Sequence, residues 1–349
     1  MSRKKKILII LLAILVFLGL IYLGVIIFVD SMLNKTTIEV IEPEEIEVVE
    51  DITPQAHEVV NFMLVGADNL DADRMNSYTE ERSDVFKILS LDYTDKVIKL
   101  ISLDRDVVVW IPDKNETGEF GRFNWAYSFG GGKYALNTIN YNLDLDVSKF
   151  VAFSFKRFRD VIDIIGGIDI RLSDAEAKEL NRDGFATMKC VEGDNHLDGY
   201  TALNFARIRH LDSDFVRMDR QNVVINAVIK KFRDSSASEL FDVANSCLPY
   251  ITTNLESSEI KKYLFDIVGF DLKNIKTQTY PLKEEEDVCW NKDSSLGGYL
   301  LRSYSNQVID LHKFIYGTED YEPSKTIYEN EKKTYETFGE FYEGSELIP

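Results

Sequence analysis

The sequence predicts an α/β protein of the α+β type, with a mixed central β-sheet covered by helices on both faces and an N-terminal transmembrane helix. Between residues 59 and 317, apolar strand-like segments alternate with segments of helical periodicity. Hydrophobic residues make up 45% of the 349 residues, which is ample for a buried core and excludes wholesale disorder. Residues 7–29 form one uninterrupted apolar run.

The apolar run Ile7–Val29 directly follows the basic cluster Arg3–Lys6. As a helix it would be about 34 Å long, enough for a hydrocarbon core of about 30 Å. A cleaved signal peptide has an apolar region of only about 7–15 residues, and no small-residue cleavage site follows Val29. Basic residues keep their side of a span in the cytoplasm. We therefore expect a single-pass type II protein of the cell membrane, with residues 1–6 cytoplasmic and the rest extracellular.

Composition divides the remainder of the chain. Residues 30–58 are acidic, carry two prolines and lack helical periodicity, so they are predicted to be a spacer. The folded domain is expected at 59–317, and residues 318–349 are expected to be a flexible acidic tail. The net charge of −19 argues against a nucleic-acid partner. The cysteines Cys190, Cys247 and Cys289 show no metal-ligand spacing, and their disulfide state stays open.

The folded domain can be divided into elements in chain order. Strands are expected at Val59–Val65, Asp84–Leu91, Lys96–Leu103, Val107–Ile111, Phe150–Phe155, Ile168–Leu172 and Ile275–Leu282. Helices are expected near Lys133–Tyr141, Phe158–Ile165, from Ser173, from Arg217 to Phe232, and at Ser238–Ser246, Ser257–Phe270 and Tyr299–Tyr316. Ser173 has Glu176 at the capping-box position.

The segment Phe205–Gln221, FARIRHLDSDFVRMDRQ, carries four arginines in this acidic chain. Arginine rather than lysine indicates planar, bidentate recognition of an oxyanion. Arg217 and Gln221 share one face of the predicted helix, and Asp214 stands where it would cap that helix. A solvated, salt-bridged helix start is the alternative interpretation.

Charged residues also stand at the ends of the predicted strands: Asp68, Arg82, Asp84, Arg105 and Asp106. Ligands of open sheets lie outside the carboxyl ends of strands. Carboxylates from separate elements beside arginines suit a magnesium-bridged pyrophosphate. For any single aspartate, turn chemistry is the simpler explanation. The glycines 130–132 offer a weak phosphate-binding signal, and Phe150–Ile165 is apolar enough to line a lipid groove, although ordinary core is the simpler role.

Seven segments occur in the order seen in the LytR-CpsA-Psr family, which the chain resembles over roughly residues 59–232. They are NFMLVGAD, ERSDVFKILSLD, LISLDRD, GRFNWAYSFGGG, DIIGGIDI, ALNFARIRH and DSDFVRMDRQ. The resemblance implies attachment of polyprenyl-pyrophosphate-linked glycans, such as teichoic acid or capsule, to peptidoglycan. It also implies release of the lipid monophosphate and dependence on Mg²⁺.

By motif, the resemblance implies that Asp68 and Asp84 bind the metal. The implied pyrophosphate-binding residues are Arg82, Arg105, Arg122, Arg207, Arg209, Arg217 and Gln221. Arg105, Asp106, Arg207, Arg209 and Asp214 are the implied catalytic group. Three residues depart from the family pattern: Asp104 replaces a usual proline, Arg122 a common lysine and Phe205 a common tyrosine. The loop between Asp68 and Arg82 is longer than usual.

The implied chemistry is phosphoryl transfer, in which positioning and charge stabilisation dominate. Either Asp84 or Asp106 is a candidate proton acceptor. Two other functions stay open: a non-catalytic envelope regulator or glycan-binding module, and a pyrophosphatase that uses water as acceptor.

Overall fold

The computed structural model describes residues 31, 33, 36–47, 56–67, 83–112, 117–182, 184–208, 211, 214–236, 239, 242, 243, 245, 246, 248–282, 288–291, 296–301 and 303–342. Within these residues, no helix is both long and apolar enough to cross a membrane. The predicted span at residues 7–29 lies outside the described part of the chain.

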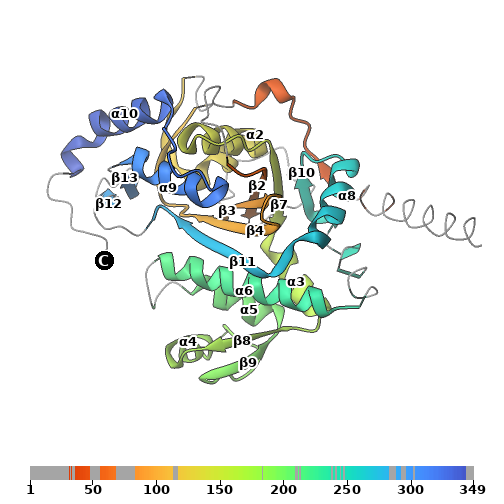
Figure 1. Ribbon diagram of the computed structural model, residues 1–349. Coiled ribbons are helices and arrows are strands. Elements are labelled where there is room, and N and C mark those ends of the chain that lie inside the picture. The colour runs from red at the N-terminus through yellow and green to blue at the C-terminus, as the bar shows by residue number, and fades with distance from the viewer. Residues whose placement is uncertain are drawn as a thin grey trace, which may run out of the picture.

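A seven-stranded mixed sheet forms the centre of the molecule (Figure 1). Its order is β1-β10-β7-β2-β3-β4-β11. The strands span Thr37–Ile38 (β1), Ile251–Thr253 (β10), Lys149–Ser154 (β7), Val59–Ala67 (β2), Ser83–Asp92 (β3), Val97–Leu103 (β4) and Asp271–Tyr280 (β11). The pairs β1–β10, β7–β2 and β4–β11 are parallel and the other three are antiparallel. The predicted mixed sheet is therefore confirmed.

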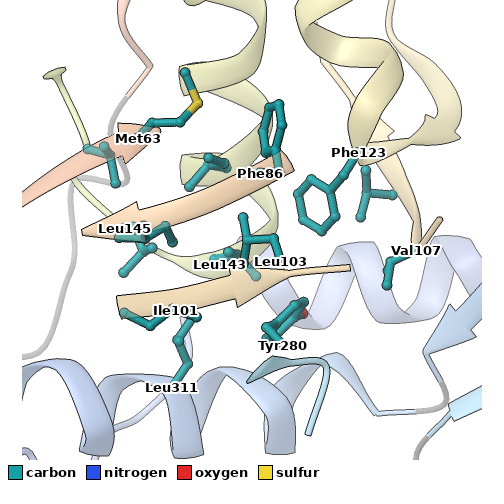
Figure 2. Packing of buried hydrophobic residues seen from close by; sticks show 14 of the residues in the cluster. Met63, Phe86, Ile101, Leu103, Val107, Phe123, Leu143, Leu145, Tyr280 and Leu311 are labelled. Carbon is teal, nitrogen blue, oxygen red and sulfur yellow. The ribbon is translucent and has the colours of Figure 1, made fainter. Parts of the chain in front are cut away.

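One face of the sheet packs against the helices α2 (Phe123–Leu143) and α9 (Tyr304–Tyr316), and α10 (Lys325–Tyr342) packs on these two helices. Side chains alternate along a strand, so Met63 and Val65 of β2 point into this layer. Figure 2 shows the resulting core, in which Met63, Phe86, Ile101 and Leu103 meet Phe123 and Leu311. All of these side chains are at most 2% exposed.

The other face packs against α6 (Asp214–Asp234) and α8 (Ser257–Asp266), which confirms helices on both faces. Here Phe62 of β2 meets Tyr263 of α8, with ring centroids 4.8 Å apart. A second core lies beyond α6 and involves α3 (Phe155–Ile164), α4 (Asp174–Leu180), α5 (Gly199–Arg207) and the hairpin β8 (Ile168–Leu172)–β9 (Gly193–Leu197). The capping box of Ser173 and Glu176 at the start of α4 is confirmed.

Helix α2 is kinked at the triple glycine, where Gly131 has a φ of 64°. A side chain at Gly132 would come within 2.3 Å of the Phe150 ring, so the helix and β7 approach closely. The amide of Gly132 donates to the Glu39 carboxylate at 3.0 Å. The amide of Gly132 therefore binds a carboxylate of this chain.

The prediction that residues 30–58 are only a spacer is wrong for its described part. Leu33 is buried, β1 pairs with β10, and the amide of Glu47 donates to Asn137 Oδ1 at 2.9 Å. Only two residues join the sheet, too few to give a periodic pattern in the sequence.

The prediction of a flexible tail at 318–349 is wrong for residues 321–342. Helix α10 buries Ile327, Asn330, Thr334 and Phe338, which lie on one helical face. Two of these four residues are polar, so hydrophobic periodicity alone does not reveal the buried face of α10.

Short strands account for the remaining differences. The hairpins β5 (Val108–Ile111)–β6 (Glu119–Arg122) and β12 (Val288–Asn291)–β13 (Gly298–Leu301) lie outside the central sheet. Residues 299–301, predicted as helix, belong to β13, and α2 begins ten residues earlier than predicted. The short helices η1 (Pro43–Glu45), η4 (Leu248–Tyr250) and η5 (Ile267–Gly269) complete the described elements.

Candidate active site

A cluster of arginines surrounds Asp106, just after the carboxyl end of β4. Arg122 Nη1, at the end of β6, lies 2.9 Å from Asp106 Oδ1. Arg105 Nε lies 3.5 Å from Asp106 Oδ2. Arg122 Nε also donates to the carbonyl of Leu296 at 2.8 Å. One carboxylate thus holds two guanidinium groups side by side.

The Asp106 side chain is only 10% exposed. Burial would raise the pKa of this carboxyl group, but the charges of Arg105, Arg122 and Arg217 outweigh burial and lower it. A carboxylate with a lowered pKa is a weak proton acceptor. Asp106 is therefore better suited to orient Arg105 and Arg122 than to accept a proton.

The turn that carries Arg105 is held by Asp104. Asp104 Oδ1 accepts from the amide of Asp106 at 2.9 Å, and the Asp104 amide donates to the carbonyl of Tyr280 at 2.8 Å. The turn is thereby fixed to the end of β11. The bond from the Asp106 amide to the Asp104 side chain gives this turn a defined shape, at a position where the family resemblance leads us to expect a proline.

Helix α6 brings further polar side chains to this region. Arg217 and Gln221 are buried one helical turn apart. The next residue, Asn222, accepts from Lys87 Nζ through Oδ1 at 2.9 Å, and Lys87 Nζ also donates to Ser102 Oγ at 2.6 Å. The charge of Asp219 raises the pKa of Lys87, and the charge of Arg217 lowers it. Strands β3 and β4 and helix α6 therefore meet at one polar centre.

Lys87 is the site residue that the sequence analysis missed. Its side chain is 1% exposed, and burial lowers the pKa of the ammonium group to about 7, with Arg217 acting in the same direction and Asp219 opposing it. A sequence signal exists, because Lys87 interrupts the apolar run VFKILSL at a position that shares a face with Leu89 and Leu91.

An apolar cavity of about 250 Å³ lies between the sheet and α8. Its lining includes Phe62 and Leu64 of β2, Leu89 of β3, Val151 of β7 and Leu264 of α8. Of the predicted lipid groove at Phe150–Ile165, Val151 lines this cavity, and the side chains of residues 154–157 lie outside the described part.

The cavity and the polar centre share one face of the sheet. Leu64 lines the cavity and pairs across strands with Lys87, which in turn pairs with Ser102. An apolar tail in the cavity would therefore end beside a buried ammonium group. This sheet face thus changes from apolar to cationic within one cross-strand row.

The structure places the other predicted residues as follows. Arg207 is exposed at the last position of α5. Asp214 is the first residue of α6, and the cap predicted for its side chain lies outside the described part of the chain. The predictions for Asp68, Arg82 and Arg209 lie outside the described residues, as does that for the side chain of Asp84.

The described strand register stops at the residue before Asp68 on β2 and includes the backbone of Asp84 on β3. Ala67, the residue before Asp68, pairs with Ser83, the residue before Asp84. The cluster of His57 with Asp92 and Asp95 suits a cation poorly, since Lys99 Nζ already lies 2.8 Å from Asp92 Oδ2.

The described residues thus place an apolar cavity beside the buried Lys87, whose ammonium group also feels the charge of Arg217. The chain belongs to the LytR_cpsA_psr family, whose family model matches residues 25–302.

Named relatives agree with this membership. The chain is 32% identical over 199 residues to the polyisoprenyl-teichoic acid–peptidoglycan teichoic acid transferase TagV of Bacillus subtilis strain 168, covering 56% of this chain and 51% of TagV. It thus matches about half the length of TagV. The transferase TagU of Bacillus mycoides strain KBAB4 is 32% identical over 239 residues, covering 66% of this chain and 73% of TagU.

A solved structure shares the fold. The family protein YwtF (TagT) with bound octaprenyl pyrophosphate lipid matches with a TM-score of 0.58 and 20% identity. The match covers 80% of this chain and all of that chain. At this identity the likeness establishes the fold.

Proposed function

We propose that this chain is a membrane-anchored phosphotransferase that moves a glycopolymer from a polyprenyl-pyrophosphate carrier to peptidoglycan and releases polyprenyl phosphate. One observation carries the proposal: an apolar cavity meets the buried Lys87 on one sheet face, and the charge of Arg217 is felt both by Lys87 and by Asp106, which holds Arg105 and Arg122. An isoprenoid tail and a pyrophosphate head require that pair of environments. The names of TagV and TagU point to the same chemistry.

In the proposed reaction a hydroxyl group of peptidoglycan attacks the phosphorus that carries the glycan. The new oxygen–phosphorus bond forms a phosphodiester, and the bond to the lipid phosphate breaks, so the lipid leaves as its monophosphate. Arg105, Arg122 and Arg217 would offset charge on the pyrophosphate. Asp106 would hold Arg105 and Arg122 in place for this task. Lys87 would lie beside the bond between the isoprenoid tail and the pyrophosphate head.

Magnesium belongs to the proposal through Asp68 and Asp84. Bound there, it would screen phosphate charge and orient its oxygens. Chelation is expected to abolish transfer, and added Mg²⁺ to restore it. The Asp84→Asn variant is expected to keep the fold and to need more Mg²⁺, because an amide replaces a charged hard ligand. Titration calorimetry with Mg²⁺ and pyrophosphate gives a readout independent of turnover. Identical Mg²⁺ affinity in variant and parent would contradict the assignment.

The membrane anchor is likewise proposed, from residues 7–29 and the basic cluster before them. A reporter fused after Pro349 is expected to be active only outside the cytoplasm. Protease added to intact spheroplasts is expected to digest the domain, and full protection would refute the topology.

The function is tested by incubating the full chain with a lipid-pyrophosphate glycan, with and without peptidoglycan. The proposal predicts a glycan bound to peptidoglycan, together with polyprenyl phosphate, only when peptidoglycan is present. Release of lipid phosphate without peptidoglycan would instead indicate a pyrophosphatase. Binding without either product would indicate a non-catalytic glycan-binding module or regulator.

A further inference from the structure

Helix α8 carries two neighbouring exposed apolar side chains at its carboxyl end. Leu264 is 56% exposed and Phe265 is 67% exposed. Single exposed apolar residues are ordinary, but these two stand at the wall of the cavity that we assign to the lipid tail. Because Leu264 both lines the cavity and faces solvent, the cavity wall and the exposed pair are continuous.

The residues around this pair combine rings with amines. Lys262 Nζ lies 4.6 Å from the centre of the Tyr263 ring and 3.0 Å from Asp266 Oδ2. Tyr93 donates to Asp266 at 2.6 Å, and Lys96 Nζ lies 4.9 Å from the Tyr93 ring centre. Tyrosine with lysine beside exposed Leu and Phe is the composition of segments that lie at a membrane–water interface.

The N-terminal chain enters the fold at the same place. Leu33 is buried and its carbonyl accepts from the amide of Thr36 at 3.0 Å. Thr36 lines the cavity, and the next residue, Thr37, pairs with Thr252 of β10. In Figure 1, β10 lies beside α8.

The predicted membrane span ends at Val29, four positions before the buried Leu33. Four residues reach at most about 14 Å. The anchor would therefore hold this edge of the sheet against the bilayer, and it leaves no long tether to carry the domain away.

We propose that the end of helix α8, with Leu264 and Phe265, inserts into the outer surface of the lipid bilayer. The cavity then faces the membrane, and an isoprenoid tail passes from the lipid phase to Leu264 and the cavity with little exposure to water. This inference rests on the proposed anchor and deepens the proposed function, because it states how the carrier lipid reaches the site.

The test places a fluorescent probe at the exposed pair. The full-length Phe265→Trp variant is reconstituted into phosphatidylcholine vesicles whose acyl chains carry bromine, a quencher of tryptophan. The Tyr335→Trp variant is the matched control, since Tyr335 is 62% exposed on α10, at the other side of the molecule from α8 (Figure 1). Relative to the parent, the added emission at position 265 is expected to be blue-shifted and quenched, and that at position 335 unchanged.

Equal quenching or no quenching at both positions would overturn the inference. Emission at position 265 that changes with protein concentration in detergent, but not with brominated lipid, would also overturn it and indicate a second copy of the chain as the partner. Flotation of the same vesicles separates this failure from failure of the anchor: a chain that does not float refutes both proposals. A chain that floats with an unquenched probe refutes only the insertion of α8.

A functional comparison is independent of fluorescence. The Phe265→Ser variant, which changes no cavity-lining residue, is expected to lose about tenfold in transfer from carrier lipid in vesicles, the effect of removing one buried aromatic side chain. Transfer from the same lipid dispersed in detergent is expected to match the parent. Parent-like transfer from vesicles would contradict the proposal.

Discussion

At the scale of single residues, α6 holds two buried arginines with different roles. The charge of Arg217 lowers the pKa of the Asp106 carboxyl group and that of the Lys87 ammonium group. Three positions later, Arg220 Nε lies 2.7 Å from Glu176 Oε1 of α4, and its Nη1 donates to the carbonyl of Ile208. In the sequence both belong to one Arg-rich segment, and the family resemblance assigns a role to Arg217 alone. Their separate partners come from tertiary packing, which spacing alone does not reveal.

The two arginines therefore make a matched pair of tests. The Arg217→Lys variant is expected to fold normally and to lose at least about tenfold in transfer, because an ammonium group cannot replace the planar fork. The Arg220→Lys variant is expected to lose about 1–3 kcal/mol of unfolding free energy while transfer per folded molecule is unchanged. Urea unfolding and transfer assays on both variants check this. Normal transfer by Arg217→Lys would remove that residue from the site.

Lys87 gives a prediction about pH. Its folded pKa of about 7 lies below the ordinary value of 10.5. The unfolded chain therefore binds more protons between these values, so this residue makes stability rise with pH across that window, by up to about 1.4 kcal/mol per unit. Below pH 7 the full cost of the buried charge is present.

The Lys87→Met variant keeps the length of the side chain without the charge. Its unfolding free energy is expected to exceed that of the parent at pH 7, with the difference shrinking toward pH 10. Denaturant unfolding at several pH values measures this. A difference that is constant with pH would show that the ammonium group is not the cause.

At the scale of elements, a buried carboxylate holds the segment that leads into α10. Asp144, at the end of α2 with a φ of 51°, accepts from the amide of Ser324 at 2.7 Å and from Tyr321 Oη at 3.0 Å. Asn330 of α10 adds a bond from Nδ2 to Asn142 Oδ1 at 2.7 Å. This docking is polar, which explains why the sequence predicted a flexible tail where the structure has a helix.

Replacing Asp144 by alanine would leave several buried donors without an acceptor. The Asp144→Ala variant is expected to lose about 2–4 kcal/mol of unfolding free energy and to expose α10. The Asp144→Asn variant is expected to lose less, since asparagine tolerates the left-handed backbone and keeps an acceptor oxygen. Amide hydrogen exchange over residues 325–342 reports the release of the helix. Unchanged exchange in the alanine variant would show that α10 is held by other contacts.

Strong local patterns made several elements predictable. Ile168–Leu172 has the predicted bounds, and Val97–Leu103 differs by one residue. The site was predictable in part, because charged residues at strand ends stand out against apolar neighbours. Lys87 and the cavity were not foreseen: the cavity is assembled from strands far apart in sequence, and a single lysine in a strand carries no local sign of its partners.

At the scale of the whole molecule, the seven-stranded sheet separates two tasks (Figure 1). One face carries the structural core under α2 and α9. The other carries the cavity and, in the same cross-strand row, Lys87 and Ser102, with Asn222 of α6 bonded to Lys87. A ligand with a long apolar tail and a charged head fits this second face in one orientation.

The affinity of polyprenyl pyrophosphate for a cavity-filling variant tests this central claim most directly. Leu89→Trp, in the cavity wall, is compared with Ile309→Trp on α9 of the opposite face, using the full chain in detergent. We predict that Leu89→Trp weakens binding of the lipid at least about tenfold and leaves binding of inorganic pyrophosphate unchanged, since only the tail loses its place. The Ile309→Trp variant is expected to bind both like the parent. Lipid binding by Leu89→Trp with the parent's affinity would contradict the account.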